Sequence, residues 1–360
     1  MPYRHELLRS LAITALSCAS LETQQITDLT KLWSYEVPGD DVVMSLEVDD
    51  SGRTIAAIRP SNTGATEGRV LCLGPLGETR WSRDMADVFS LRAVVHPSGE
   101  ITVGATTSST LVPGALGGKD VWLIRLDPDG QELWQKRVGG SGDNTLAELA
   151  SFEDGFYIAG ETEADGYAGA TTPCGLGAPR CTYIARYNSV GDELWAHTDG
   201  TAGSYYDVGA IAVSPSGRVT FGGIATTPGH TPREFQFVYR QNGLRLSANS
   251  SIGYGIRYLA FPADGWTLSV IHDPDADSFV RRPAASLGTN SWIRTWSRGV
   301  FYTGSFGVSA LGGDQLLGAV YGSHYDGVSP RYAELVRADA TGAVLQRYEF
   351  PVENNIAQVP

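Results

Sequence analysis

Residues that could act as catalysts or metal ligands are scattered along the chain. The sequence has six histidines, and no two of them form an HxH or HExxH pair that would place both on one metal ion. Residues 139–143 read GGSGD and lack the final glycine of a nucleophile elbow, so we interpret them as a loop. Asp273, Asp275 and Asp277 alternate as in hard-cation loops, without the glycine and glutamate of an EF-hand. We therefore predict no catalytic residue, no metal site and no cofactor.

Tyrosines in long loops are the residues that we expect to contact a ligand. Tyrosine among glycine, serine and threonine is typical of adaptable recognition surfaces. The alternative is that these rings cover strand ends as part of the core. The candidate ligand-binding residues are Tyr167, Tyr205, Tyr206 and Tyr302.

Three of the four cysteines are candidates for lipid attachment or for a disulfide bond. Cys18 follows a short apolar run and the tripeptide Ala-Leu-Ser, which resembles a bacterial lipobox. We expect an export signal over residues 1–18 and lipid attachment at Cys18, with ordinary signal cleavage or a cytosolic N-terminus as the alternatives. Cys174 and Cys181 flank a Gly/Pro-rich loop and predict a disulfide in an exported protein, with free thiols or a metal pair as alternatives. Cys72 lies in an apolar run and predicts a buried thiol.

Charge limits the classes of partner. The 360 residues contain 27 Lys and Arg against 40 Asp and Glu, for a formal net charge of -13. Because binding to a phosphate backbone requires clusters of Lys and Arg, we expect no nucleic-acid partner. No stretch after the N-terminal segment reaches the roughly 18 apolar residues of a membrane helix. We therefore expect membrane attachment only through a lipid anchor.

An internal repeat decides the fold class. Four tryptophans recur along the chain at intervals of 48, 53 and 61 residues. The next position in this series, 246, holds leucine, and a last tryptophan follows about two units after the fourth tryptophan. Each unit contains four apolar runs and tight turns, which at a period near 50 residues is the signature of a β-propeller. The recurring tryptophans predict packing between blades rather than a sugar site. They are Trp33, Trp81, Trp134, Trp195 and Trp296.

Short turns join the apolar runs. Residues 96–99, 127–130 and 214–217 each carry proline second and glycine last. This pattern predicts a type I turn followed by a glycine in the left-handed region.

The repeat also resembles a known family. The unit that begins at Trp122 reads WLIRLDPDGQELWQKRVGGSGDN and continues to GFYIAG. It resembles the SBBP repeats of bacterial secreted proteins and lipoproteins. The two central units match best, and weaker copies extend over residues 31–350. The resemblance implies a propeller that is usually exported, and it implies no shared chemistry.

The predicted fold class is an all-β, single β-propeller of six four-stranded blades, and seven blades would require strands that the pattern does not show. The first strand candidate, Lys31–Val37, is left over and could join the last blade. We expect the blades at 43–81, 91–138, 146–197, 208–248, 255–296 and 308–350. The domain prediction is an export signal at 1–18, a linker at 19–30, the propeller at 31–350 and a tail at 351–360.

The function predicted from this architecture is recognition. Tight turns collect on one face of the predicted propeller and long loops on the other, where binding is usual. We expect a non-enzymatic, exported binding or scaffold module, either a cell-surface lipoprotein or a periplasmic or secreted protein, that binds a protein, peptide or glycan. One alternative is a glycosidase-type or lyase-type enzyme with its site in the central channel, where Arg92 and Glu148 are the charged exceptions on mostly apolar inner strands. The other is a structural envelope protein.

Overall fold

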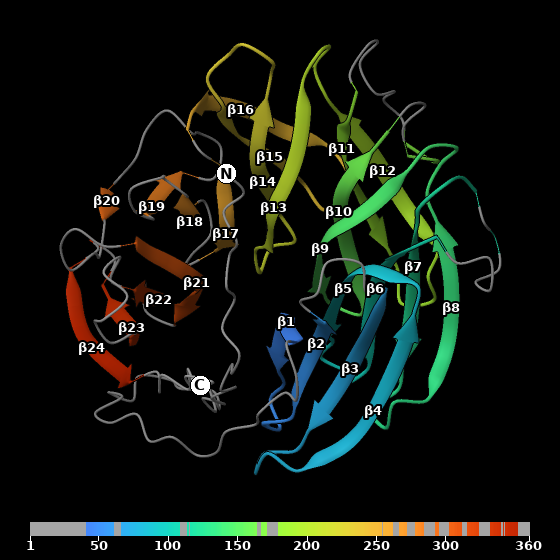
Figure 1. The fold of residues 1–360 in the computed structure, drawn as a ribbon, viewed down its shortest axis with the longest axis horizontal. Coiled ribbons are helices and arrows are strands. Elements are labelled where there is room, and N and C mark those ends of the chain that lie inside the picture. The colour runs from blue at the N-terminus through green and yellow to red at the C-terminus, as the bar shows by residue number, and fades with distance from the viewer. Residues whose placement is uncertain are drawn as a thin grey trace, which may run out of the picture. The chain divides into compact units, whose positions relative to one another are not determined.

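The structure is a computed structural model in which every described element is a β-strand (Figure 1). The described residues are 41–60, 66–108, 114, 116–163, 167–170, 179–253, 255–261, 266–271, 278–283, 292–294, 302–311, 315–323, 332–339, 341 and 343–351. Residues 1–40, which include Cys18, Trp33 and the strand candidate Lys31–Val37, lie outside these ranges.

The strands form six four-stranded sheets, each an antiparallel meander in chain order. The first three sheets contain β1 (Asp41–Val48), β2 (Thr54–Pro60), β3 (Glu67–Leu73) and β4 (Thr79–Ala86); β5 (Val88–Val95), β6 (Ile101–Thr107), β7 (Asp120–Leu126) and β8 (Glu132–Val138); and β9 (Asn144–Phe152), β10 (Gly155–Thr162), β11 (Cys181–Tyr187) and β12 (Glu193–Asp199).

The remaining three sheets follow the same plan. They contain β13 (Tyr205–Val213), β14 (Val219–Thr226), β15 (Arg233–Tyr239) and β16 (Arg245–Ile252); β17 (Ile256–Ala260), β18 (Trp266–Ile271), β19 (Ser278–Pro283) and β20 (Trp292–Arg294); and β21 (Tyr302–Leu311), β22 (Gln315–Ser323), β23 (Tyr332–Ala338) and β24 (Val344–Pro351).

The chain divides into two compact units. The first contains Met1–Cys174 with Tyr183–Thr198, and the second contains Gly175–Thr182 with Asp199–Pro360. In the first unit the leading strands β1, β5 and β9 are neighbours, and in the second β17 contacts both β13 and β21. Within each unit, consecutive sheets therefore pack as blades with their first strands together. The fold class is an all-β propeller with four-stranded blades, and the described residues supply the six blades that the repeat predicts.

Each of the six leading strands contains one irregularity in its pairing with the second strand. On the leading strands the register shifts lie at Val43/Ser45, Val88/Ser90, Leu146/Glu148, Val208/Ala210, Ile256/Tyr258 and Ser305/Gly307. A β-bulge increases local twist and redirects side chains. The leading strands can therefore crowd together without remaining flat.

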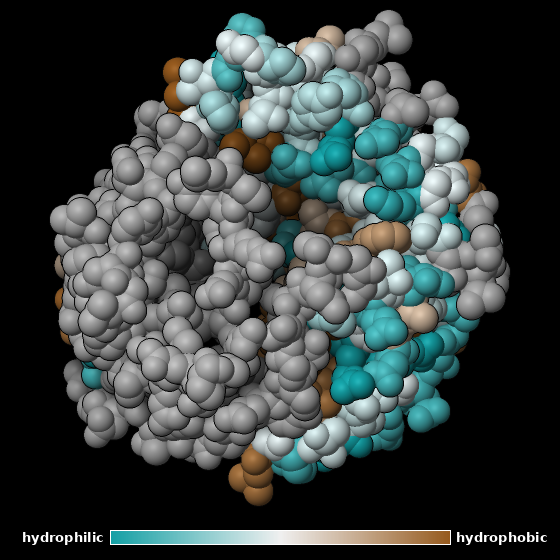
Figure 2. Space-filling model, viewed as in Figure 1, coloured by the Kyte–Doolittle hydropathy of each residue, from teal (hydrophilic) through white to brown (hydrophobic). Residues whose placement is uncertain are grey.

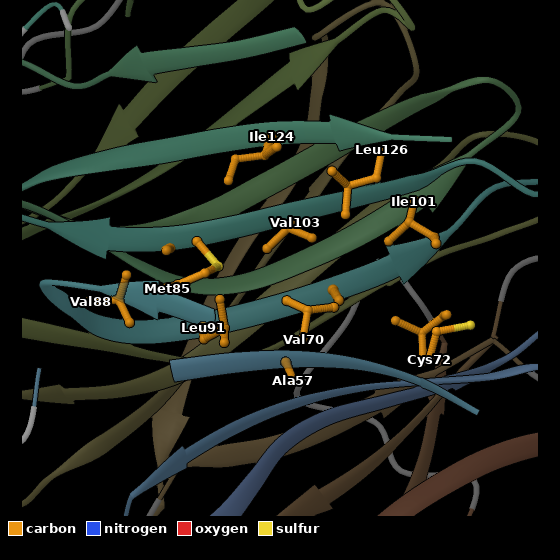
Figure 3. Packing of buried hydrophobic residues seen from close by; sticks show 13 residues of the cluster. Ala57, Val70, Cys72, Met85, Val88, Leu91, Ile101, Val103, Ile124 and Leu126 are labelled. Carbon is orange, nitrogen blue, oxygen red and sulfur yellow. The ribbon is translucent and has the colours of Figure 1, made fainter. Parts of the chain in front are cut away.

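The cores lie between blades. One cluster combines Val70 and Cys72 of the first blade with Leu91, Val103 and Ile124 of the second, and Figure 3 shows these side chains converging from the two sheets. Cys72 is a buried free thiol, as predicted, and burial raises its pKa to about 11. Because a four-stranded sheet buries its faces only against its neighbours, each blade depends on the next one.

The tight turns confirm the predicted geometry. In the turn at 127–130 the Gly130 amide donates to the Asp127 carbonyl at 3.0 Å, and the Asp127 amide donates to the Gln131 carbonyl at 2.9 Å. Gly130 has φ +82°, which a side chain would oppose. The Asp127 carboxylate accepts from the amides of Asp129 and Gln131 at 2.9 and 2.8 Å, and so fixes the turn from inside.

Two of the repeated tryptophans, Trp81 and Trp134, lie on the turns of the next blade, whereas the ring neighbours of Trp195 are Tyr157 and His197. The ring of Trp81 is 2.7 Å from where a Cβ on Gly130 would stand, and its indole N–H donates to the Pro128 carbonyl at 3.1 Å. Trp134 repeats both contacts, with 3.1 Å to the Cβ position of Gly191 and 3.0 Å to the Ser189 carbonyl. The prediction of packing between blades is thus confirmed for these two tryptophans, and Trp296 lies outside the described residues.

The assignment of the tryptophan position in the fourth unit needs a correction. Ser247 pairs with Val238 just as Trp134 pairs with Arg125, and Leu246 is the bulged residue that corresponds to Leu133. Counting from the turn glycine gives the same alignment. The fourth blade therefore has serine, and not Leu246, where the first three blades have Trp81, Trp134 and Trp195.

The contact of Trp81 or Trp134 with a turn of the next blade acts as a clamp between blades, and truncation of one such side chain should weaken the interface. We expect Trp134→Ala to lower the free energy of unfolding by about 3 kcal/mol, since the change removes both the ring contact and the indole hydrogen bond. Leu133→Ala is a matched control, because the neighbouring Leu133 is half exposed, and it should change stability by less than about 0.5 kcal/mol. Urea unfolding followed by fluorescence measures both variants. Equal losses of unfolding free energy in the two variants would contradict a role of Trp134 in holding the blades together.

A buried polar network supports the turn end of the second blade. His96 Nε2 lies 2.8 Å from Thr102 Oγ1, which also accepts from Arg125 Nη1 at 2.9 Å. Arg125 pairs with Glu100 at 2.8 Å. Burial, together with the nearby charge of Arg125, lowers the pKa of His96 to about 3. His96 is therefore neutral in the folded protein at all but strongly acidic pH.

This pKa has a consequence for acid stability. Between about pH 6.5 and pH 3 the unfolded chain binds a proton at His96 and the folded chain does not, so stability should fall as the pH is lowered through this window. The slope from this one group reaches about 1.4 kcal/mol per pH unit. We expect His96→Gln to remove this component from urea unfolding measured across the window, whereas the exposed His230→Gln should keep it. A slope unchanged in the His96 variant would refute the assignment.

Candidate functional site

Tyr167, a predicted ligand-binding residue, lies in the core of the first unit. Its side chain is 3% exposed, its ring stacks on Tyr183 with 4.4 Å between centroids, and its hydroxyl bonds to that of Tyr187. Tyr187 in turn donates to Glu193 at 3.1 Å. Burial raises the pKa values of all three tyrosines. The prediction that Tyr167 offers its ring to a ligand is therefore corrected: the ring anchors the long insert between β10 and β11.

Tyr206 and Tyr205 alternate in and out along β13. Tyr206 is 8% exposed, packs edge-to-face on Phe235 at 5.3 Å and shares a 2.9 Å hydrogen bond with Thr201. The alternative reading, in which rings cover blade ends, thus applies to Tyr206 as it does to Tyr167. Tyr205 is 43% exposed. Tyr302 begins β21, and its side chain lies outside the described residues.

Tyr205 stands beside an exposed ion pair. Arg180 Nη1 is 3.0 Å from Asp207 Oδ1, and the two side chains are 39% and 53% exposed. Tyr205 and Asp207 are two positions apart on one strand and therefore project on the same side, about 6.6 Å apart along the backbone. We call Arg180, Tyr205 and Asp207 the β13 surface. It combines an aromatic ring, an acceptor and a guanidinium at the beginning of a leading strand.

The β13 surface has a rigid base. Thr182 donates to the Asp199 carbonyl at 3.1 Å, and a Cβ on Gly200 would stand 2.2 Å from the Cys181 sulfur. The Asp199 carboxylate accepts from Tyr239 and Arg245. Cys181 is disulfide-bonded, while its predicted partner Cys174 lies outside the described residues. Residues 180–182 are thus held against the loop that leads into Tyr205.

Charged groups also lie on the leading strands of the first unit. Arg92 of β5 contacts both carboxylate oxygens of Glu148 on β9, at 3.1 and 3.3 Å. On the neighbouring strand β2, Arg59 donates to the Phe89 carbonyl of β5, and burial together with the charge of Arg92 lowers the pKa of Arg59. On β1, burial raises the pKa of Glu47 to about 7. The charge of Glu47 therefore changes near neutral pH.

This arrangement limits the chemistry that these strands support. Glycoside hydrolysis uses two carboxyl groups, one as acid and one as base or nucleophile. Because Arg92 engages both oxygens of Glu148, that carboxylate is occupied as a structural ion-pair partner. Glu47 has a pKa suited to proton transfer, and it stands without a second available carboxylate among the charged groups described on these strands.

Some of the other predicted features lie among the described residues, and others lie outside them. Among the described residues, no group of three or more His, Cys, Asp and Glu side chains is arranged to hold a metal ion. The described part of the chain has no helix long and apolar enough to cross a membrane. Residues 273–277 and Cys18 lie outside the described ranges. On the face shown in Figure 2, hydrophilic side chains cover most of the described surface, and hydrophobic ones form small separate spots.

No family model and no curated protein matches the sequence. Solved structures resemble it at low identity. A eukaryotic initiation factor is 11% identical, with 89% of this chain and 68% of that chain covered and a TM-score of 0.43. A variant of apocarotenoid oxygenase from Synechocystis is 11% identical, with 85% and 71% covered and a TM-score of 0.46. An uncharacterized protein from Listeria monocytogenes is 11% identical, with 83% and 79% covered and a TM-score of 0.44. These likenesses indicate no function.

Sequence reasoning missed two members of the β13 surface. Arg180 ends a long insert and Asp207 lies on a strand, so no local motif joins them. The alternation along the start of β13 was the available signal, since Tyr205 and Asp207 share one side and Tyr206 and Val208 share the other. That pattern separates the exposed tyrosine from the buried one.

Proposed function

We propose that this chain is a non-enzymatic, extracytoplasmic binding or scaffold module that recognises its ligand through the β13 surface. The observation that carries the proposal is an exposed aromatic ring, Tyr205, beside the exposed Arg180–Asp207 pair on a fixed strand. Tyrosine supplies a large contact area at low cost in conformational entropy, and polar neighbours supply orientation. A rigid scaffold with such a group at a loop end is a common form of binding site.

Three observations support an extracytoplasmic location. Cys181 is disulfide-bonded, and disulfides persist mainly in oxidising compartments. The repeat resembles SBBP repeats of exported proteins, and the segment before Cys18 resembles a lipobox. The proposed location is the cell surface or outer membrane through a lipid at Cys18, or otherwise the periplasm or the medium. The partner is a protein, peptide or glycan.

The enzyme alternative depends on one group. Burial holds the pKa of Glu47 at about 7, as a general acid or base would require. A second catalytic carboxyl would have to come from outside the charged groups described on β5 and β9, because Arg92 occupies Glu148. The binding proposal uses groups that are already exposed together, and we therefore favour it.

The test compares cells that express the chain or its variants. The native chain should fractionate with the envelope or the medium, and purified labelled chain should bind envelope material from the same cells. Tyr205→Ala should reduce this binding about tenfold, since it removes the central contact area. Leu244→Ala, at an exposed site on the tight turn between β15 and β16, is the matched control and should leave binding unchanged.

A cytosolic chain with reduced cysteines would overturn the proposed location. Binding that is equally strong in wild type and the Tyr205 variant would overturn the proposed site. Thermal unfolding of each variant verifies that the fold is intact.

A further inference from the structure

We propose that the β13 surface binds a neutral glycan. This inference rests on the proposed function and specifies the ligand class of the same site. It combines the chemistry of the three exposed side chains, the balance of their charge and the rigidity of the segments that carry them.

The aromatic component suits a sugar better than a peptide. A sugar ring offers a flat face of C–H groups that packs on an aromatic face and hydroxyls at its edges that need polar partners. Tyr205 supplies the ring, and the exposed residues before it, Thr201, Ala202 and Gly203, are small and leave its surroundings open. A peptide interface usually has an apolar centre that is fully desolvated. Next to Tyr205 stand Arg180 and Asp207, which are polar and partly hydrated.

The charge of the surface favours a neutral ligand. Each sugar hydroxyl both donates and accepts, so Asp207 can accept from a hydroxyl and Arg180 can donate to one while their own 3.0 Å contact persists. An anionic glycan would have to compete with Asp207 for Arg180. It would also approach a chain of formal net charge -13, which repels anions at long range.

The surface is pre-organised. Tyr206 is buried against Phe235 and bonded to Thr201, so the backbone of Tyr205 is fixed from below. Arg180 precedes the disulfide-bonded Cys181, whose sulfur packs on Gly200. A site that is already ordered loses less entropy when it binds a ligand. This matters for sugars, whose individual contacts are weak.

Arg257 provides an internal discriminator. It is exposed on β17, the neighbouring leading strand in the same unit, and a Cβ on Gly209 would stand 2.1 Å from the Ile256 carbonyl. Arg257 therefore lies beyond Asp207 along the same pair of strands. A neutral glycan on Tyr205 and Asp207 does not need this extra cation, whereas an anionic ligand would use it.

The experiment is calorimetric titration of the full chain with defined oligosaccharides. The neutral probes are cellohexaose, maltohexaose and N-acetylchitohexaose, and the anionic probes are oligogalacturonate and a heparin hexasaccharide. We expect at least one neutral probe to bind, with Tyr205→Ala and Asp207→Asn each lowering the association constant about tenfold or more. Tyr205→Phe should retain most of the affinity, because it keeps the ring. Arg257→Gln should stay within about threefold of wild type.

Three results would overturn the inference. They are no binding of any neutral probe, binding that Tyr205→Ala leaves unchanged, or binding of an anionic probe that Arg257→Gln abolishes. Envelope material treated with protease or with periodate separates this inference from the proposed function. Binding that depends on Tyr205, resists periodate and disappears after protease would refute the glycan while leaving a protein-binding module. Binding that disappears only after periodate supports the glycan.

Discussion

The contact between an indole ring and a turn glycine of the next blade is the constraint on which the other features depend. Trp81 covers Gly130 and Trp134 covers Gly191, and in both cases the indole N–H bonds to a carbonyl of the same turn. Glycine is required at these positions for two reasons: its φ is positive, and the indole ring occupies the space that a Cβ would need. A four-stranded sheet cannot bury both faces alone, so this contact transmits stability from blade to blade.

The same contact gives the two ends of a blade different roles, one structural and one free to vary in sequence. At the turn end, side-chain oxygens of Asp49, Asp127 and Asn188 accept hydrogen bonds from the backbone amides that follow them in the short loops. The other end carries the long loops and can vary without loss of the clamps. The insert between β10 and β11 uses that freedom, since it is anchored by Tyr167 and ends in the Arg180–Cys181 segment against the loop that leads to Tyr205. Recognition at the β13 surface is consistent with this division.

The repeat determined how much of the structure could be predicted. Blade boundaries, turn types and the role of Trp81 and Trp134 depend on residues within one unit or on identical positions in adjacent units, so a periodic pattern reveals them. Two tyrosines were misplaced because loop composition does not distinguish a ring that points outward from one that packs inward. Leu246 was assigned to the tryptophan position because the spacing between units varies, whereas counting four residues from the turn glycine, as from Gly130 to Trp134, leads from Gly243 to Ser247. Arg180 and Asp207 meet only because the fold brings the end of an insert to a strand 27 residues away.

Amide hydrogen exchange on the intact chain tests most directly whether the turn ends of the blades are held by the neighbouring blades while the loop ends open more easily. The amides of the clamped glycines Gly130 and Gly191 donate to turn carbonyls at 3.0 and 3.2 Å, whereas residues 201–203 are exposed. We predict that these two turn amides exchange only through opening of whole blades, and that the segment at 201–203 exchanges orders of magnitude faster. Turn amides that exchange as fast as residues 201–203 would contradict the account, because the turns would then not be clamped by the blades beside them.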